Sequence, residues 1–123
     1  MKLDDLYTAD IHEEGSEVRI LDRSGNETDL YIKVKGVDSP SFRKWSKSHS
    51  KKRLEALRQS KDFDEDASIT QGLLDCTIGW RGVEEKFSKK LCAELYEKAP
   101  YIKDQVDIFM GEAENFTKAK PKK

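Results

Sequence analysis

The chain has 123 residues, of which 23 are basic and 24 acidic, so its formal net charge is -1. The mean hydropathy of -0.82 and the hydrophobic fraction of 36% fit one small domain, expected over residues 1–117, with a limited core. They exclude a helical membrane protein, because no run approaches the ~18 apolar residues that a membrane-spanning helix needs. The acidic residues at the N-terminus and the lack of an apolar stretch there predict no secretory signal peptide.

The near-zero net charge conceals four blocks of alternating sign. Residues 1–32 carry 3 basic and 9 acidic groups, and residues 33–61 carry 10 basic and 2 acidic groups. Residues 62–85 are again acidic, with 1 basic and 7 acidic groups, and residues 86–123 carry 9 basic and 6 acidic groups. The blocks could pair with one another within the fold, form solvated helix faces, or present one positive face to a partner.

A β-hairpin is expected over residues 17–35, because apolar and polar residues alternate on both sides of a turn that contains Gly25 and Asn26. The apolar face of this hairpin consists of Val18, Ile20, Leu30, Ile32 and Val34. A lone hairpin is only marginally stable in water. The hairpin therefore needs a helix, or a third strand from residues 1–12, to cover its apolar face.

Helical spacing of apolar residues follows the hairpin to the end of the folded region. It predicts helices near residues 40–60, 66–80, 88–99 and 100–117. Ser39 is suited to cap the first of these helices, with Pro40 at its first position. Residues 118–123 are expected to form a flexible basic tail. The expected fold class is α+β, predominantly α-helical, with an N-terminal β-hairpin followed by about four helices.

The motifs of common catalytic sites are missing from the chain, so we expect no enzyme, no cofactor and no metal site. The D-x-D-x-D spacing at residues 62–66 is typical of the start of a calcium-binding loop. That loop also needs a Gly and a bidentate Glu where this chain has Ala67 and Leu73, so we reject it. Cys76 and Cys92 lie within apolar helical patterns and are expected to be buried, unpaired thiols in a reducing cytosol.

The basic helix near residues 40–60 is the expected partner-binding segment. Its candidate contact residues are Phe42, Arg43, Trp45, Lys51, Lys52 and Arg53. Aromatic side chains ringed by cations on a helix without a continuous apolar stripe are typical of a surface that binds a partner. In the alternative interpretation, Phe42 and Trp45 simply cover the apolar face of the hairpin.

Positions between Gly72 and Phe116 resemble the tail assembly chaperones of long-tailed phages and related prophages. The residues that carry the resemblance are Gly72-Leu73-Leu74, Gly79-Trp80-Arg81-Gly82-Val83, Phe87-Ser88, Ile102, Gln105-Val106 and Phe109. Upstream, the stretch from Val34 to Ser39 and the pair Phe42-Arg43 fit the same pattern. The resemblance covers about 80 of the 123 residues.

This resemblance implies a protein that binds the long, helical, aggregation-prone tape measure protein and keeps it soluble while the tail tube polymerises around it. It implies a location in the host bacterial cytoplasm and absence from the mature virion. It also implies a longer product of ribosomal frameshifting, whose extra domain recruits the tail tube protein. The sequence leaves the oligomeric state open, a homo-oligomer included, and suggests no contact with a membrane.

A small nucleic-acid-binding module is the alternative function. The cations of residues 41–61 could follow a phosphate backbone while Trp45 stacks on a base. The isoelectric point of about 6.2 and the acidic blocks on both sides of this segment argue against it.

Overall fold

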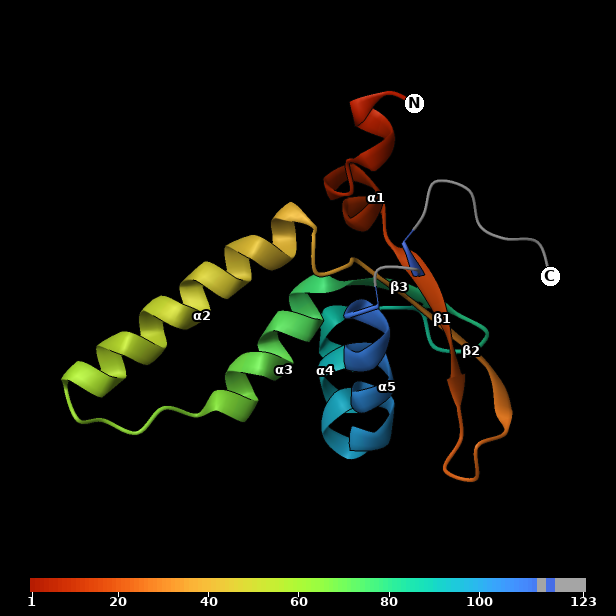
Figure 1. Ribbon diagram of the computed structural model, residues 1–123. Helices are drawn as coiled ribbons and strands as arrows, with labels where there is room; N and C mark the ends of the chain where they lie inside the picture. Colours follow the sequence, from red (N-terminus) through yellow and green to blue (C-terminus); the bar gives the residue numbers. More distant parts are fainter. Residues whose placement is uncertain (113–114, 117–123) are drawn as a thin grey trace.

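The computed structural model describes residues 1–112 and 115–116, which form a three-stranded antiparallel sheet with helices packed against one of its faces (Figure 1). In chain order the elements are η1 (Leu3–Leu6), α1 (Ala9–Glu14), β1 (Ser16–Leu21), β2 (Glu27–Val34), α2 (Pro40–Arg58), α3 (Glu65–Cys76), β3 (Thr77–Arg81), α4 (Lys89–Lys98) and α5 (Pro100–Met110). This arrangement confirms the predicted α+β, helix-rich fold class, with the hairpin β1–β2 followed by four helices.

The hairpin turn is stabilised by its own side chains. The Asp22 carboxylate accepts hydrogen bonds from the backbone N–H groups of Ser24 at 2.9 Å and Asn26 at 3.0 Å. Gly25 adopts a φ of 86°, a left-handed conformation that costs glycine little because it has no Cβ. The predicted hairpin therefore forms where the alternating pattern placed it.

The third strand is the main correction to the sequence-based prediction. A helix was expected over residues 66–80, but α3 ends at Cys76 and the chain continues directly into β3. β3 pairs antiparallel with β2, and Trp80 lies opposite Ile32. Residues 77–81 form a strand and not a helix for two reasons. Thr77 and the glycine at 79 disfavour a helix, and β2 offers a free edge of backbone donors and acceptors. The apolar spacing of residues 66–80 could not show that β2 has a free edge beside them.

Residues 1–12 do not supply a strand, contrary to one of the two expectations for covering the hairpin. They form η1 and the first part of α1. The apolar face of the sheet is covered by helices instead, and α5 packs on both β1 and β2. The side-chain amide of Gln105 in α5 also bonds the backbone N–H and C=O of Leu21, at 2.8 and 2.9 Å. This pair of bonds satisfies polar groups on the outer strand of the sheet.

The core lies between the sheet and the helices α3, α4 and α5. Its buried hydrophobic residues are Val18, Ile20, Ile32, Val34, Leu73, Cys76, Cys92, Tyr96, Ile102, Val106, Met110 and Phe116. The Lys89 ammonium at the start of α4 donates to the carbonyls of Leu74 and Thr77, which are near the end of α3. This cation adds a second donor to the Leu74 carbonyl, which also accepts the Thr77 backbone N–H at the end of α3.

The last helix is shorter than predicted. α5 ends at Met110, followed by Gly111, whereas the apolar spacing had suggested a helix to residue 117. The Phe116 ring nevertheless returns to the core, where it stacks on His12 with ring centroids 4.6 Å apart. The final position of the predicted helix and the predicted basic tail, residues 118–123, lie outside the described residues.

Candidate partner-binding surface

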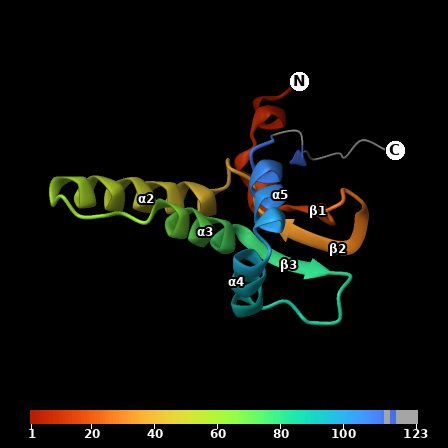
Figure 2. The same ribbon diagram turned by 90° about the horizontal axis from the view of Figure 1, so that it is seen from below.

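Helices α2 and α3 form an arm that extends away from the sheet. We use the term arm for residues 40–76, which comprise both helices and their connecting loop. Figures 1 and 2 show the two helices side by side, with the far end of α2 well beyond the rest of the molecule. Ser39 caps α2 as predicted, since its hydroxyl accepts a hydrogen bond from the Phe42 backbone N–H at 3.1 Å, and Pro40 follows at the first helical position.

The two aromatic candidates lie on the inner side of the arm. Trp45 is half-buried, and its indole N–H donates to the Ser68 carbonyl of α3 at 3.0 Å. The Phe42 ring is also half-buried, with its centroid 5.4 Å from that of Trp45. Trp45 therefore attaches α2 to α3. It packs on α3 and not on the hairpin, and its role in partner binding stays a prediction.

His49 extends this aromatic contact along the arm. Its ring stacks on Trp45 at 4.8 Å and meets Phe63 edge-on at 5.4 Å, and its Nδ1 lies 2.6 Å from the Ser68 hydroxyl. His49 is not among the partner-binding candidates predicted from the sequence. The helical spacing of residues 42, 45 and 49 could have indicated that the three rings share one face of α2. It was missed because a histidine counts as polar in an apolar pattern.

The cationic candidates are more exposed than the two aromatic residues. The side chains of Lys51, Lys52 and Arg53 are all exposed. Arg53 lies 3.5 Å from Glu65 at the start of α3, and Arg43 lies 3.9 Å from Asp38. Both ion pairs are largely exposed, so each contributes little to stability. The six candidates therefore comprise two half-buried aromatic residues and four exposed cations, two of which form ion pairs.

Two leucines of α2 lie among its exposed cations. Leu54 is 56% exposed and Leu57 is 75% exposed. With Lys47, Lys51 and Arg58 they form what we call the outer face of α2. By helical spacing Leu54 and the three cations lie opposite the aromatic group, and Leu57 lies at the edge of the face. Among the described residues, the three cations of this face have no ion pair or side-chain hydrogen bond. The outer face thus combines unpaired positive charge with exposed apolar surface.

The base of the arm is held by α1. The Asp38 backbone N–H donates to His12 Nδ1 at 3.1 Å, and the Thr8 hydroxyl donates to the Asp38 carboxylate at 2.9 Å. Lys35 donates to Glu13 at 2.6 Å and holds the pKa of that carboxyl below its usual range. These contacts fix the direction in which α2 leaves the body.

The two cysteines are buried and unpaired, as the sequence predicted. Burial raises the pKa of Cys76 to about 11, and burial also raises the pKa of Cys92. A thiol acts as a nucleophile or metal ligand only as its thiolate, so neither residue is suited to such chemistry at neutral pH. No cluster of three or more potential metal ligands occurs within residues 1–112 and 115–116.

No protein-family model, curated protein or solved structure matches this chain. No helix in the described part of the chain is long and apolar enough to cross a membrane.

Proposed function

We propose that this protein is a phage tail assembly chaperone that binds the tape measure protein, keeps it soluble and promotes polymerisation of the tail tube around it. The observation that carries the proposal is the outer face of α2, where Leu54 and Leu57 stand exposed among unpaired cations on a projecting helix. The resemblance described under Sequence analysis supplies the identity of the partner. The protein would act in the host bacterial cytoplasm and be absent from the mature virion.

The outer face fits an amphipathic helix that has acidic residues beside its apolar stripe. Exposed leucines can bury the apolar stripe of such a helix, which lowers its tendency to aggregate. The surrounding cations attract the acidic residues and speed association without adding much to the final affinity. A weak, rapidly formed contact of this kind suits a chaperone that must later release its client to the tube.

Co-purification with the tape measure protein tests the charge contribution. Reversal of Lys47, Lys51 and Arg58 to Glu should reduce the amount of tape measure protein recovered, and more so at low salt. A matched variant reverses three exposed cations elsewhere, Lys2, Arg23 and Lys86, and changes the net charge equally. The proposal is wrong if both triple variants recover as much partner as the parent chain.

The apolar contribution is tested separately by Leu54→Ala together with Leu57→Ala. Both side chains are largely exposed, so the melting temperature should change by less than a few degrees while partner recovery falls. Leu21→Ala, at a side chain 37% exposed on the sheet, is the control. Equal partner recovery by the parent chain, the double variant and the control would show that the binding surface does not lie on the arm.

Nucleic-acid binding is the competing function, and the exposed cations of α2 are the observation in its favour. Its proposed base-stacking residue is poorly placed, because Trp45 is half-buried and hydrogen-bonded to Ser68. A salt titration with a single-stranded oligonucleotide distinguishes the two functions. Tight binding with a steep dependence on salt, lost on reversal of Lys51, Lys52 and Arg53, would favour the nucleic-acid module.

The tail tube protein enters this proposal only through a longer, frameshifted form of the chaperone. Adjacent lysine codons, such as those for the pair at 122 and 123, are A-rich and can form a run on which a ribosome slips. Expression of the gene with its downstream region should yield a minor longer product that shares residues 1–117, detectable by mass spectrometry. A gene without a slippery run or a downstream reading frame would remove the tube protein from the proposal.

A further inference from the structure

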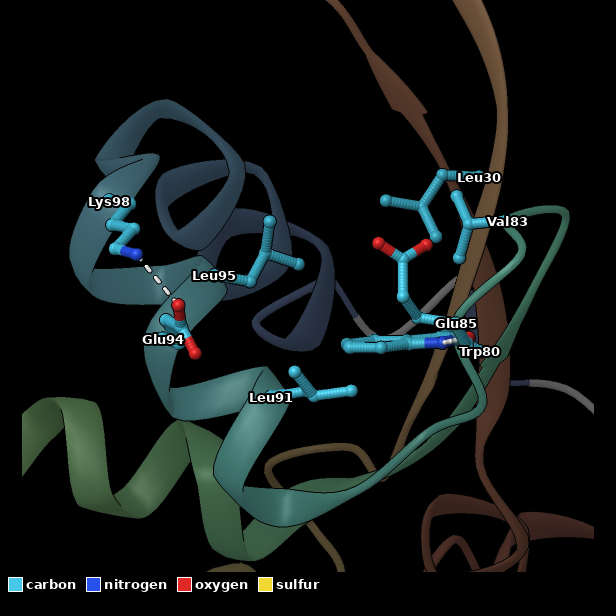
Figure 3. A pocket seen from close by; sticks show the side chains of 8 residues that line it. All are labelled: Leu30, Trp80, Val83, Glu85, Leu91, Glu94, Leu95 and Lys98. Carbon is cyan, nitrogen blue, oxygen red and sulfur yellow. Dashed lines mark hydrogen bonds and ion pairs between the residues drawn. The ribbon is translucent and has the colours of Figure 1, made fainter.

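A pocket of about 270 Å³ opens between the sheet and α4, and none of its lining residues belongs to the arm. It is lined by Leu30, Trp80, Val83, Glu85, Leu91, Glu94, Leu95 and Lys98 (Figure 3). Four of the eight lining residues are aliphatic, one carries an indole ring and three are charged. The volume lies just below the range of about 300–1,000 Å³ typical of sites for whole small molecules. It suits one or two side chains of a docking segment.

The indole ring of Trp80 is held in a fixed orientation. Its N–H donates to the Glu85 backbone carbonyl at 2.9 Å, and its ring meets Phe87 edge-on, with centroids 5.1 Å apart. Figure 3 shows the indole nearly edge-on, with the Glu85 carboxylate and Leu95 on one side of its plane and Leu91 on the other. One face of the ring is therefore presented to the same space as the carboxylate.

Glu85 is the uncompensated charge of this pocket. Glu94 pairs with Lys98 at 2.6 Å, and Figure 3 shows that pair at the opposite end of the view from Glu85. Within the described part of the chain, the Glu85 carboxylate has no ion pair or hydrogen bond. An aromatic face and an unpaired carboxylate, set beside aliphatic side chains, together favour a cation on a long apolar stem.

We propose that this pocket is a docking site for an arginine side chain on a segment of a partner protein. The guanidinium would stack on the Trp80 ring and pair with Glu85, while its stem and a neighbouring apolar residue contact Leu30 and Leu95. Arginine fits better than lysine because its planar group can stack on an indole and bond a carboxylate through two N–H groups at once. The site is separate from the arm, so either proposal can fail without the other.

The probe is the capped peptide Ala-Leu-Arg-Leu-Ala, titrated into the ¹⁵N-labelled full chain and followed by NMR. We expect a saturable shift of the Trp80 indole N–H signal. The indole signal of Trp45 is an internal control and should stay in place, because that group is bonded to Ser68 on the arm. A peptide with lysine in place of arginine should bind several-fold more weakly. A peptide with citrulline, which has the same shape but no charge, should give no saturable shift.

Glu85→Gln should weaken binding of the arginine peptide about tenfold, since it removes a charge-assisted hydrogen bond. The fold should persist, because the indole of Trp80 bonds to the backbone carbonyl of residue 85 and not to its side chain. Glu84→Gln is the matched control, as Glu84 is exposed and does not line the pocket. The proposal is wrong if the Trp80 indole signal shows no saturable shift. It is also wrong if the lysine peptide or the citrulline peptide binds as tightly as the arginine peptide. Equal effects of Glu85→Gln and Glu84→Gln would overturn it as well.

Discussion

The indole ring of Trp45 lies directly against the backbone of α3 at Gly72, where a Cβ atom would overlap the ring at Cε2. The two helices of the arm approach this closely only because residue 72 has no side chain. Gly72 is buried inside α3, where a glycine is otherwise unfavourable by about 1 kcal/mol relative to alanine. Close helix packing explains its presence there.

Gly72→Ala should therefore destabilise the protein by roughly 1–2 kcal/mol, although alanine favours a helix. The Trp45 ring has to move, and its bond to the Ser68 carbonyl is then strained or lost. Urea unfolding measures the loss of stability, and the NMR signal of the Trp45 indole N–H reports on its bond to Ser68. Gly79→Ala is the control, since a Cβ there meets no atom within 4 Å. A Gly72→Ala protein at least as stable as the parent chain would show that the arm packs more loosely than described.

Truncation of two leucines should have unequal effects. Both lie at the centre of apolar helical stripes, and from the sequence each Leu→Ala change was expected to cost ~2–5 kcal/mol. In the structure Leu73 is 4% exposed, whereas Leu95 is half-buried and lines the pocket. We expect the full ~2–5 kcal/mol for Leu73→Ala and only about 1 kcal/mol for Leu95→Ala. Denaturant unfolding of the two variants checks this order, and equal losses would contradict it.

The thiols of the folded protein should resist modification. Cys76 and Cys92 are both fully buried, and burial raises the pKa of both. A disulfide reagent added at pH about 8 should react with both cysteines in denaturant and with neither on the same timescale in the native state. Rapid labelling of native protein would indicate that α3 and α4 separate readily from the sheet.

Stability should fall as the pH is lowered through about 6.5, because of His12. The pKa of His12 is lowered mainly by burial, while the nearby Asp38 carboxylate raises it and the Arg43 cation lowers it. The unfolded chain therefore binds a proton at a higher pH than the folded chain does. The resulting stability is complete above the unfolded pKa and is lost as the pH falls from that value towards the folded pKa.

Urea unfolding of the parent chain and of His12→Gln, measured between about pH 8 and pH 5, isolates this effect. The parent chain should lose stability over that interval, and the variant should lose less. Protonation of His12 also conflicts with the bond in which Nδ1 accepts the Asp38 N–H. Equal pH dependence of the two proteins would show that His12 does not titrate in this way.

Much of the fold could be predicted because it depends on local patterns. The alternation around Gly25 placed the hairpin, and the caps Ser39 and Ser88 placed the starts of α2 and α4, since each side chain bonds a backbone N–H three residues on. Such features involve residues close in sequence, so composition and spacing determine them. Burial of the two cysteines followed from their place within apolar stripes.

Tertiary contacts decided the rest. β3 became a strand because β2 offered it a free edge, and Trp45 packs on α3 because that helix has no side chain at Gly72. The fixed indole of Trp80 likewise depends on the loop that carries Glu85. These outcomes depend on which surfaces meet in three dimensions, and helical or strand periodicity records only that a residue faces one side of its element.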